Sequence, residues 1–304
     1  MMCLKPTSLD SGIGIEYLYQ QTLAILQKDN PKEALSLNCS GIRFVRPESI
    51  IALITVARLW HQATGHKTYL HNIPVLVHKY LERMDVFTQC NLWIEEDEQL
   101  PEEQRFGRSA NSTTLLEVLP IASDEQQNTQ DILVAHKRAS HILRTWFDAE
   151  NDSIERLLSM MSEIASNVSH SHDQGFAVIQ RYQDSGVRRD GSRIVMAISD
   201  LGIGIEASLR NKPVYASGVP LAHPITGADY ILHALQLGVT SRNEIGGLGL
   251  PRVKELVEQW AGLLVIRSRH SRIQASSEGV RKRNDLSGIP GTQVIISLTF
   301  QGLR

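Results

Sequence analysis

An acidic residue and two glycines after a short apolar run constrain this chain more than any other sequence feature. Ile194 to Ile198 is rich in β-branched residues and predicts a buried strand. Asp200, Gly202 and Gly204 follow it, with Ile205 next. Because glycine lacks a Cβ atom and accepts unusual backbone angles, this pattern allows the main chain to approach a flat ligand closely. The same pattern occurs in ordinary turns, so it predicts a binding site only together with other motifs.

The segment from about Asp152 to His172 is predicted to form an amphipathic helix ahead of that strand. Glu163, Asn167 and His170 are four and three residues apart, so they share one polar face of the helix. An amide oxygen is a ligand that Mg²⁺ accepts, and a carboxylate can orient or deprotonate a nucleophile. This face therefore predicts a metal-phosphate site, with a solvated polar face as the alternative. The apolar stripe of the helix consists of Ile154, Leu157, Leu158, Met161, Ala165 and Val168.

Two further glycine motifs lie downstream. Gly246–Leu250 runs into a predicted helix, and Gly262 comes just after the end of that helix. Glycines at a helix N-terminus expose N–H groups and the positive end of the helix dipole, which favours phosphate binding. Gly291 and Thr292 lead into Gln293–Leu298, whose alternating pattern predicts the final strand.

Taken in order, these motifs resemble those of the GHKL ATPase family, which includes gyrase B-type ATPases, heat-shock chaperones, histidine kinases and anti-sigma serine kinases. The matching segments are Glu163-x-x-x-Asn167-x-x-His170, Asp200-x-Gly202-x-Gly204-Ile205, Gly247-Leu248-Gly249-Leu250 and Gly291-Thr292. The resemblance covers roughly residues 150–304. It implies a Bergerat-type α/β sandwich, with a mixed sheet, helices on one face, and ATP between helices and sheet.

The resemblance also implies a role for each matching residue. Asn167 would hold Mg²⁺, and Glu163 would be the general base, as in gyrase-like ATPases and anti-sigma kinases. Asp200 would accept a hydrogen bond from the adenine amino group. The motif glycines would give room to the base and ribose or meet the phosphates, and Thr292 would support the adenine pocket. One departure is Ile245, which stands where the family often has a glycine.

The stretch from Glu206 to Gly246 is rich in proline and glycine and is predicted to form the ATP lid, with a short helix over 228–237. Thr240 and Arg242 precede the glycine cluster, and Arg242 could reach a phosphate or remain on the surface. The candidate nucleotide-binding set is Asn167, His170, Asp200, Gly202, Gly204, Ile205, Thr240, Arg242, Gly247, Leu248, Gly249, Leu250 and Thr292.

Beyond the lid, strands are predicted over 263–267 and 293–300. The basic connection over 269–289 is predicted to be a solvated loop, with a site for an acidic partner as the alternative.

The N-terminal half alternates strand and helix patterns. Residues 1–30 are predicted to form a helical segment, in which Asp10–Ile15 repeats the glycine pattern with no strand ahead of it and leads into a helix over 15–27. Residues 31–100 are predicted to form a small α/β domain, with strands within 35–44, 67–71 and 90–94 and helices over 47–60 and 75–84.

This domain loosely resembles STAS-like domains, the partners of anti-sigma kinases. His71–Pro74 stands where the antagonists in that group carry a phosphoacceptor serine, so phosphorylation there is not expected. A structural domain for dimer or partner contact is the alternative.

Residues 101–150 are predicted to be a linker and connecting helix, with a strand over 115–121 and a helix over 131–147, ahead of the ATP-binding domain at 151–304. His136 and His141 lack the acidic residue and proline that follow the phosphoacceptor of histidine kinases, so packing or a solvated face is expected. His170–Asp173 is predicted to be a loop at a helix end and not a zinc site.

Composition excludes several functional classes. The net charge of −2 does not favour nucleic-acid binding, and no apolar run reaches the ~18–20 residues of a membrane span. The first ten residues contain no signal-peptide core. Three cysteines without metal or disulfide spacing fit a reducing, cytoplasmic location.

The sequence therefore predicts a Mg²⁺-ATP-dependent regulatory ATPase or serine/histidine protein kinase that acts in intracellular signalling through a protein partner. A homodimer is compatible with this expectation. The alternative is a non-catalytic module in which ATP orders the lid and so controls partner binding.

Overall fold

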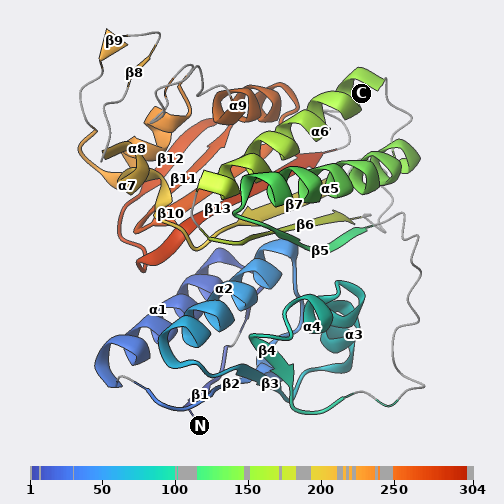
Figure 1. The fold of residues 1–304 in the computed structure, drawn as a ribbon, viewed down its shortest axis with the longest axis vertical. Coiled ribbons are helices and arrows are strands. Elements are labelled where there is room, and N and C mark those ends of the chain that lie inside the picture. The colour runs from blue at the N-terminus through green and yellow to red at the C-terminus, as the bar shows by residue number, and fades with distance from the viewer. Residues whose placement is uncertain are drawn as a thin grey trace. The chain divides into compact units, whose positions relative to one another are not determined.

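The chain forms two compact units, Met1–Ser112 and Thr113–Arg304 (Figure 1). The computed structural model describes residues 2–6, 8–29, 31–99, 101, 115–146, 151–170, 173–182, 193–210, 215–216, 219–220, 224–236, 239 and 249–299. The predicted α/β (α+β) class is confirmed, because the structure describes a four-stranded parallel sheet in unit 1 and a separate seven-stranded sheet in unit 2. Among the described helices, none combines the length and the apolar character needed to cross a membrane.

Unit 1 alternates strands with helices around a parallel sheet of order β1-β2-β3-β4. Its elements are β1 (Met2–Leu4), α1 (Gly12–Asp29), β2 (Leu35–Asn38), η1 (Cys39–Gly41), α2 (Pro47–Thr64), β3 (Thr68–His71), α3 (Val75–Arg83), α4 (Val86–Gln89) and β4 (Ile94–Glu96). Parallel neighbours need a crossover between them, and the helices supply it. Most of α2 is buried, and Trp60 at 0% exposure donates its indole N–H to the Glu33 carbonyl oxygen over 3.0 Å.

The predicted helices of unit 1 are confirmed, with longer bounds for α1 and α2. The strand predicted within 35–44 ends early, because the Asn38 side chain accepts a hydrogen bond from the Ser40 N–H and starts η1. The strand predicted over 90–94 is wrong for all but Ile94, where β4 begins. The repeated glycine pattern enters α1 at Gly12.

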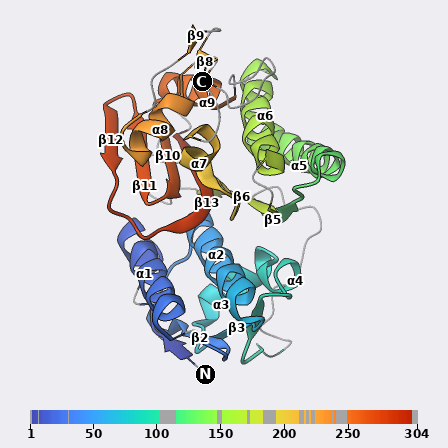
Figure 2. The ribbon, with the colours of Figure 1, turned by 60° about the vertical axis from the view of Figure 1, so that its left-hand side comes forward.

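Seven strands of unit 2 form a sheet of order β12-β11-β10-β13-β7-β6-β5 (Figures 1 and 2). Its helices are α5 (Glu125–Trp146), α6 (Asn151–Ser166), η3 (Asn167–His170), α7 (Gly204–Arg210), α8 (Gly227–Ala234) and α9 (Gly249–Gln259). Its strands are β5 (Leu115–Ile121), β6 (Gly175–Tyr182), β7 (Arg193–Ser199), β10 (Leu263–Arg269), β11 (Ser271–Ser276), β12 (Gly279–Arg283) and β13 (Ile289–Thr299), beside a separate short pair, β8 (Tyr215–Ala216) and β9 (Val219–Pro220).

The expected mixed sheet is wrong for the described strands of unit 2, whose pairings are all antiparallel. The alternating segments Phe176–Tyr182 and Arg193–Ser199, joined by a turn-rich stretch, predict a β-hairpin, and the antiparallel pairing of β6 with β7 confirms it. Strands β10, β11 and β12 follow one another as a meander. The last strand, β13, lies between β10 and β7 and runs antiparallel to both. Strands β7 and β10 run in the same direction, but β13 lies between them and pairs antiparallel with each. No parallel pair therefore forms among the described strands of this sheet.

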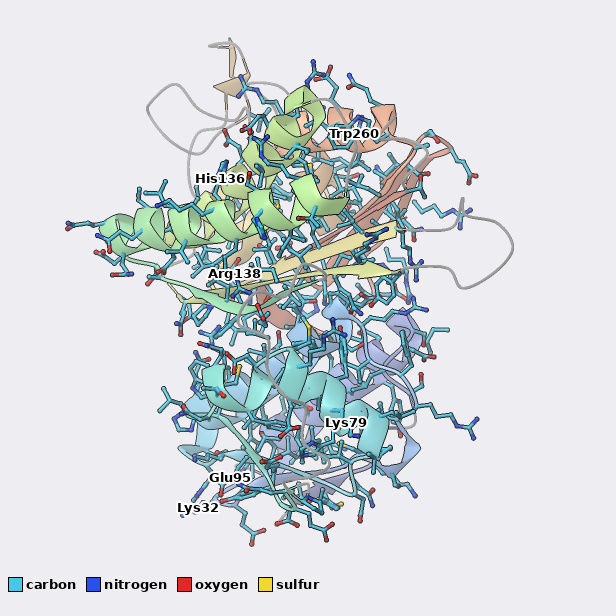
Figure 3. The ribbon with its side chains drawn as sticks, turned by 90° about the vertical axis from the view of Figure 1, so that its right-hand side faces the viewer. Lys32, Lys79, Glu95, His136, Arg138 and Trp260 are labelled. Carbon is cyan, nitrogen blue, oxygen red and sulfur yellow. The ribbon has the colours of Figure 1, made fainter. Side chains whose placement is uncertain are left out.

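Helices α5, α6, α8 and α9 share one core with one face of this sheet, which we call the helix face (Figure 1). Ile194, Met196 and Ile198 of β7 point into that core, as the alternation of a strand requires. The segment predicted as a linker and connecting helix contains β5, an edge strand, and α5, which packs on it. Figure 3 shows Arg138 on the side of α5 toward β5, where it forms an ion pair with Glu117.

The three cysteines are expected to differ in reactivity. Cys39 and Cys90 are buried, and loss of solvation raises the pKa of each thiol to about 12, whereas Cys3 is exposed. Because the thiolate is the reactive form, a disulfide reagent at mildly alkaline pH should modify one thiol quickly and the other two only after unfolding. Cys3→Ser should remove the fast phase, and a fast phase that survives this substitution would contradict the burial of Cys39 and Cys90.

Candidate functional site

Asp200 lies at the end of β7 and is held by its own turn. Its carboxylate Oδ1 accepts a hydrogen bond from the Gly202 N–H over 2.8 Å. A short acidic side chain that bonds the backbone two residues ahead stabilises a tight turn, which explains the aspartate at this position. The Asp200 N–H donates to the Thr292 carbonyl oxygen over 3.0 Å, so β13 also holds the turn. Asp200 is only 8% exposed.

Gly291 permits this contact between β13 and the Asp200 turn. Its φ of +80° lies in the left-handed region, which favours glycine. A Cβ atom at Gly291 would overlap the carbonyl oxygen of Asp200 and lie 2.6 Å from its carbonyl carbon. The register of β13 against β10 shifts at the same place. The Gly-Thr motif and the Asp-x-Gly-x-Gly motif, about 90 residues apart in sequence, are therefore in main-chain contact.

Gly204 packs as tightly, against β10. Its φ is +78°, and a Cβ atom there would lie 2.7 Å from Ser268 Oγ. Ser268 Oγ accepts a hydrogen bond from the Ile205 N–H over 2.9 Å and donates to the Gly291 carbonyl oxygen over 3.3 Å. Glycine is thus required at position 204 by internal packing. Ser268 was not predicted as a site residue, although a serine at a core-facing position of an apolar strand is a detectable signal.

Gly175, the first residue of β6, packs between the residue before Asp200 and the end of the helix that carries Glu163. A Cβ atom at Gly175 would lie 2.7 Å from the Ser199 carbonyl oxygen and 2.7 Å from a methyl group of Val168. Val168 follows Asn167 and Ser199 precedes Asp200, so the candidate magnesium ligand and the candidate adenine acceptor come from neighbouring backbone segments. Gly175 was not predicted as a site residue either, because a single glycine before a strand has many explanations.

The helix that carries Glu163 and Asn167 changes form between them. It is α-helical to Ser166 and a 3₁₀ helix over Asn167–His170, where the sequence pattern predicted one continuous α-helix. The 3₁₀ turn is tighter, so the expected common face of the two residues no longer follows from helical spacing alone. Asn167 is exposed and Glu163 is partly buried. The backbone of His170 ends the 3₁₀ turn, and its side chain lies outside the described residues.

Glu163 lies against the beginning of α9. A Cβ atom at Gly249 would be 2.7 Å from Glu163 Oε2, so this carboxylate is packed onto the first residue of the helix. The positive end of a helix dipole attracts a carboxylate. Leu250 packs its side chain against the core, as Ile205 does at the start of α7. The glycine-cluster motif and the Glu163 helix therefore also meet.

A groove of about 270 Å³ lies between α6 and α9 beside Glu163. Its lining residues are Arg156, Ser159, Met160, Glu163, Arg252, Glu255, Leu256 and Gln259. The groove gives access to the Glu163 carboxylate from a surface that carries both acidic and basic side chains.

Four candidate residues, Thr240, Arg242, Gly247 and Leu248, lie outside the described residues. The described parts of the predicted lid contain α8, close to the short helix that was expected, and also α7 and the β8–β9 pair. His136 lines a cavity of about 20 Å³ between α5, α6 and the sheet, and Figure 3 shows it on α5. His141 is exposed.

Comparison with the models of known protein families finds no match to this chain, and a search of curated proteins finds none either. Across the described ranges, no three His, Cys, Asp or Glu side chains form a group that could hold a metal ion.

Gly291→Ala should destabilise unit 2 strongly, because it adds left-handed strain and an overlap with the Asp200 carbonyl group. We expect the free energy of unfolding to fall by about 4 kcal/mol or more in urea titrations followed by circular dichroism. Gly279→Ala is the matched control, since φ there is +124° and no atom lies within 4 Å of the added Cβ. It should cost only about 1–3 kcal/mol of strain. Equal losses in the two variants would refute the close approach of β13 to Asp200.

Proposed function

We propose that unit 2 binds Mg²⁺-ATP as a GHKL-type regulatory ATPase or protein kinase and acts through a protein partner. The observation that carries this proposal is the meeting of four sequence motifs. Gly291 contacts the Asp200 turn, Gly175 packs this turn against the end of the Glu163 helix, and Glu163 contacts Gly249. At each of the three glycines an added Cβ atom would lie 2.7 Å or less from an atom of the neighbouring motif segment.

The residues present suit the proposed ligands. A nearly buried carboxylate such as Asp200 accepts a hydrogen bond with little competition from water, as recognition of an adenine amino group needs. Mg²⁺ takes oxygen ligands and keeps several waters and phosphate oxygens, so the exposed amide of Asn167 suits it as a single protein ligand. When bound, the ion would neutralise phosphate charge.

The side chains then have separate roles in phosphoryl transfer, which depends mainly on positioning and electrostatics. Asp200 orients the base, and the start of α9 directs its N–H groups and dipole toward negative charge. Glu163, at the edge of the groove, takes the proton of an attacking water or of a partner's hydroxyl group. The structure leaves both acceptors open, since a groove of this size admits a side chain as well as water.

One observation favours a second function. The position of Glu163 at the start of α9 is also explained if its carboxylate only stabilises the helix dipole. In that case ATP binding at this site would control a partner without turnover. The two functions place the same nucleotide in the same site, and they differ in what Glu163 does.

Asp200→Asn should lower ATP affinity at least about tenfold in calorimetric or fluorescent-analogue titrations with Mg²⁺. Asparagine keeps the oxygen that accepts from the Gly202 N–H, so the turn survives while the charge and the second acceptor oxygen are lost. Asp285→Asn is the control, because that carboxylate is 73% exposed and lies outside the site. Unchanged ATP affinity in Asp200→Asn would contradict the assigned pocket.

Glu163→Gln should leave ATP affinity within about threefold and lower turnover by a factor of about 10² or more, because a general base is removed. Phosphate release and transfer to a candidate partner would be measured beside Glu255→Gln, which removes a carboxylate from the opposite wall of the same groove. Loss of turnover with full partner regulation would favour the gated module. Turnover equal to the wild type would exclude Glu163 as the base.

A further inference from the structure

The basic segment that was predicted to be a loop forms the edge of the seven-stranded sheet. Within the described residues, β12 pairs with β11 on one side and with no strand on the other, and Figure 2 shows it at the margin of the sheet. All five residues of β12 are exposed. An edge strand presents unpaired N–H and C=O groups that can pair with another strand.

Three arginines lie directly opposite one another across the adjacent strands β10, β11 and β12. Arg283 of β12 pairs with Arg272 of β11, and Arg272 pairs with Arg267 of β10. We call Arg283, Arg272 and Arg267 the arginine row. Cross-strand partners lie on the same face of a sheet, and neighbouring strands are about 4.8 Å apart. The row therefore crosses one face at right angles to the strands.

The row lies on the face opposite the helices. Ile273, next to Arg272, belongs to the core of the helix face and pairs with Lys282. Lys282 Nζ bonds Asp229 Oδ1 of α8 over 2.7 Å, which shows that Lys282 points toward the helices. Because side chains alternate, Arg281 and Arg283 point the other way.

Like charges directly opposite each other destabilise a sheet, so the row has an energetic cost. Two contacts offset part of it. Arg283 bonds the Asp285 carboxylate over 2.9 Å, which lowers the pKa of Asp285, and Arg267 donates to the Ser287 carbonyl oxygen over 2.7 Å. Protection of the edge against aggregation explains charge on β12. It does not explain Arg272, which is partly buried, or Arg267, which is 7% exposed on an inner strand.

We propose that β12 and the arginine row bind an extended acidic segment of a protein partner, which adds to the sheet as a further strand. Arg281 and Arg283 are two residues apart, about 7 Å along the strand, the spacing of alternate side chains in an added strand. Carboxylates at alternate positions of the partner would meet them while its backbone pairs with the edge. A nucleic acid could not pair with this backbone edge, and the net charge of −2 gives it no overall attraction. This interaction does not depend on nucleotide binding.

The test uses the full chain and a fluorescein-labelled peptide in which glutamate alternates with threonine, followed by fluorescence anisotropy. Arg281→Gln combined with Arg283→Gln should raise Kd about tenfold, because two exposed ion pairs are lost. Lys282→Gln is the control for the face, since it removes one positive charge from the same strand on the helix side, and it should change Kd less than about twofold. Equal effects of the two changes would overturn the assignment of the face.

Backbone pairing is tested separately by a peptide of the same charge that carries N-methyl groups at alternate residues. This peptide should bind at least about tenfold more weakly, because it cannot donate hydrogen bonds to the edge of β12. Equal binding of the methylated peptide would overturn strand addition. Preferential binding of single-stranded oligonucleotides over the acidic peptide would overturn the class of partner.

Discussion

The close approach of β13 to the end of β7 is the constraint on which the candidate site depends. A side chain at position 291 would occupy the same space as the Asp200 carbonyl group, so the approach exists only because this residue is glycine. Through it the Asp200 N–H reaches the Thr292 carbonyl oxygen, and Ser268 reaches both the Gly291 carbonyl oxygen and the Ile205 N–H. Three strands and the start of α7 thus meet through main-chain contacts and the Ser268 hydroxyl group. The Asp200 carboxylate is oriented by a backbone N–H group, which is more rigid than a side chain.

The two faces of the unit 2 sheet carry different chemistry. On the helix face, apolar side chains of alternate strand residues pack under α5, α6, α8 and α9, and the motif residues lie where these helices and the strands end. On the other face, arginines of three adjacent strands follow one another. Alternation of side chains separates the two, as Lys282 and its neighbours in β12 show. A nucleotide site and a partner surface can therefore exist in one unit without sharing a residue.

Local patterns predicted much of the fold, because burial on one face leaves a period in the sequence. The bounds of β5 and β7 agree with the structure, and so do the α2 start at Pro47 and the β6–β7 pairing. β12 was missed for a physical reason. Both of its faces are exposed, so no apolar period marks it, and its charged residues resemble a loop. The antiparallel order was missed because the place of β13 depends on pairing with strands distant in sequence.

The sequence by itself determined the spacing of the motif residues, the strand that ends at Ser199 and the glycines that permit close approach, since these follow from side-chain volume and period. Only the tertiary structure decided which glycines touch which partners, with Gly175 between Val168 and Ser199 and Gly249 against Glu163. It also decided the 3₁₀ turn at Asn167 and the opposition of Arg267, Arg272 and Arg283. The physical reason is that these features depend on register and on contacts between distant segments. A local sequence pattern determines neither the register nor those contacts.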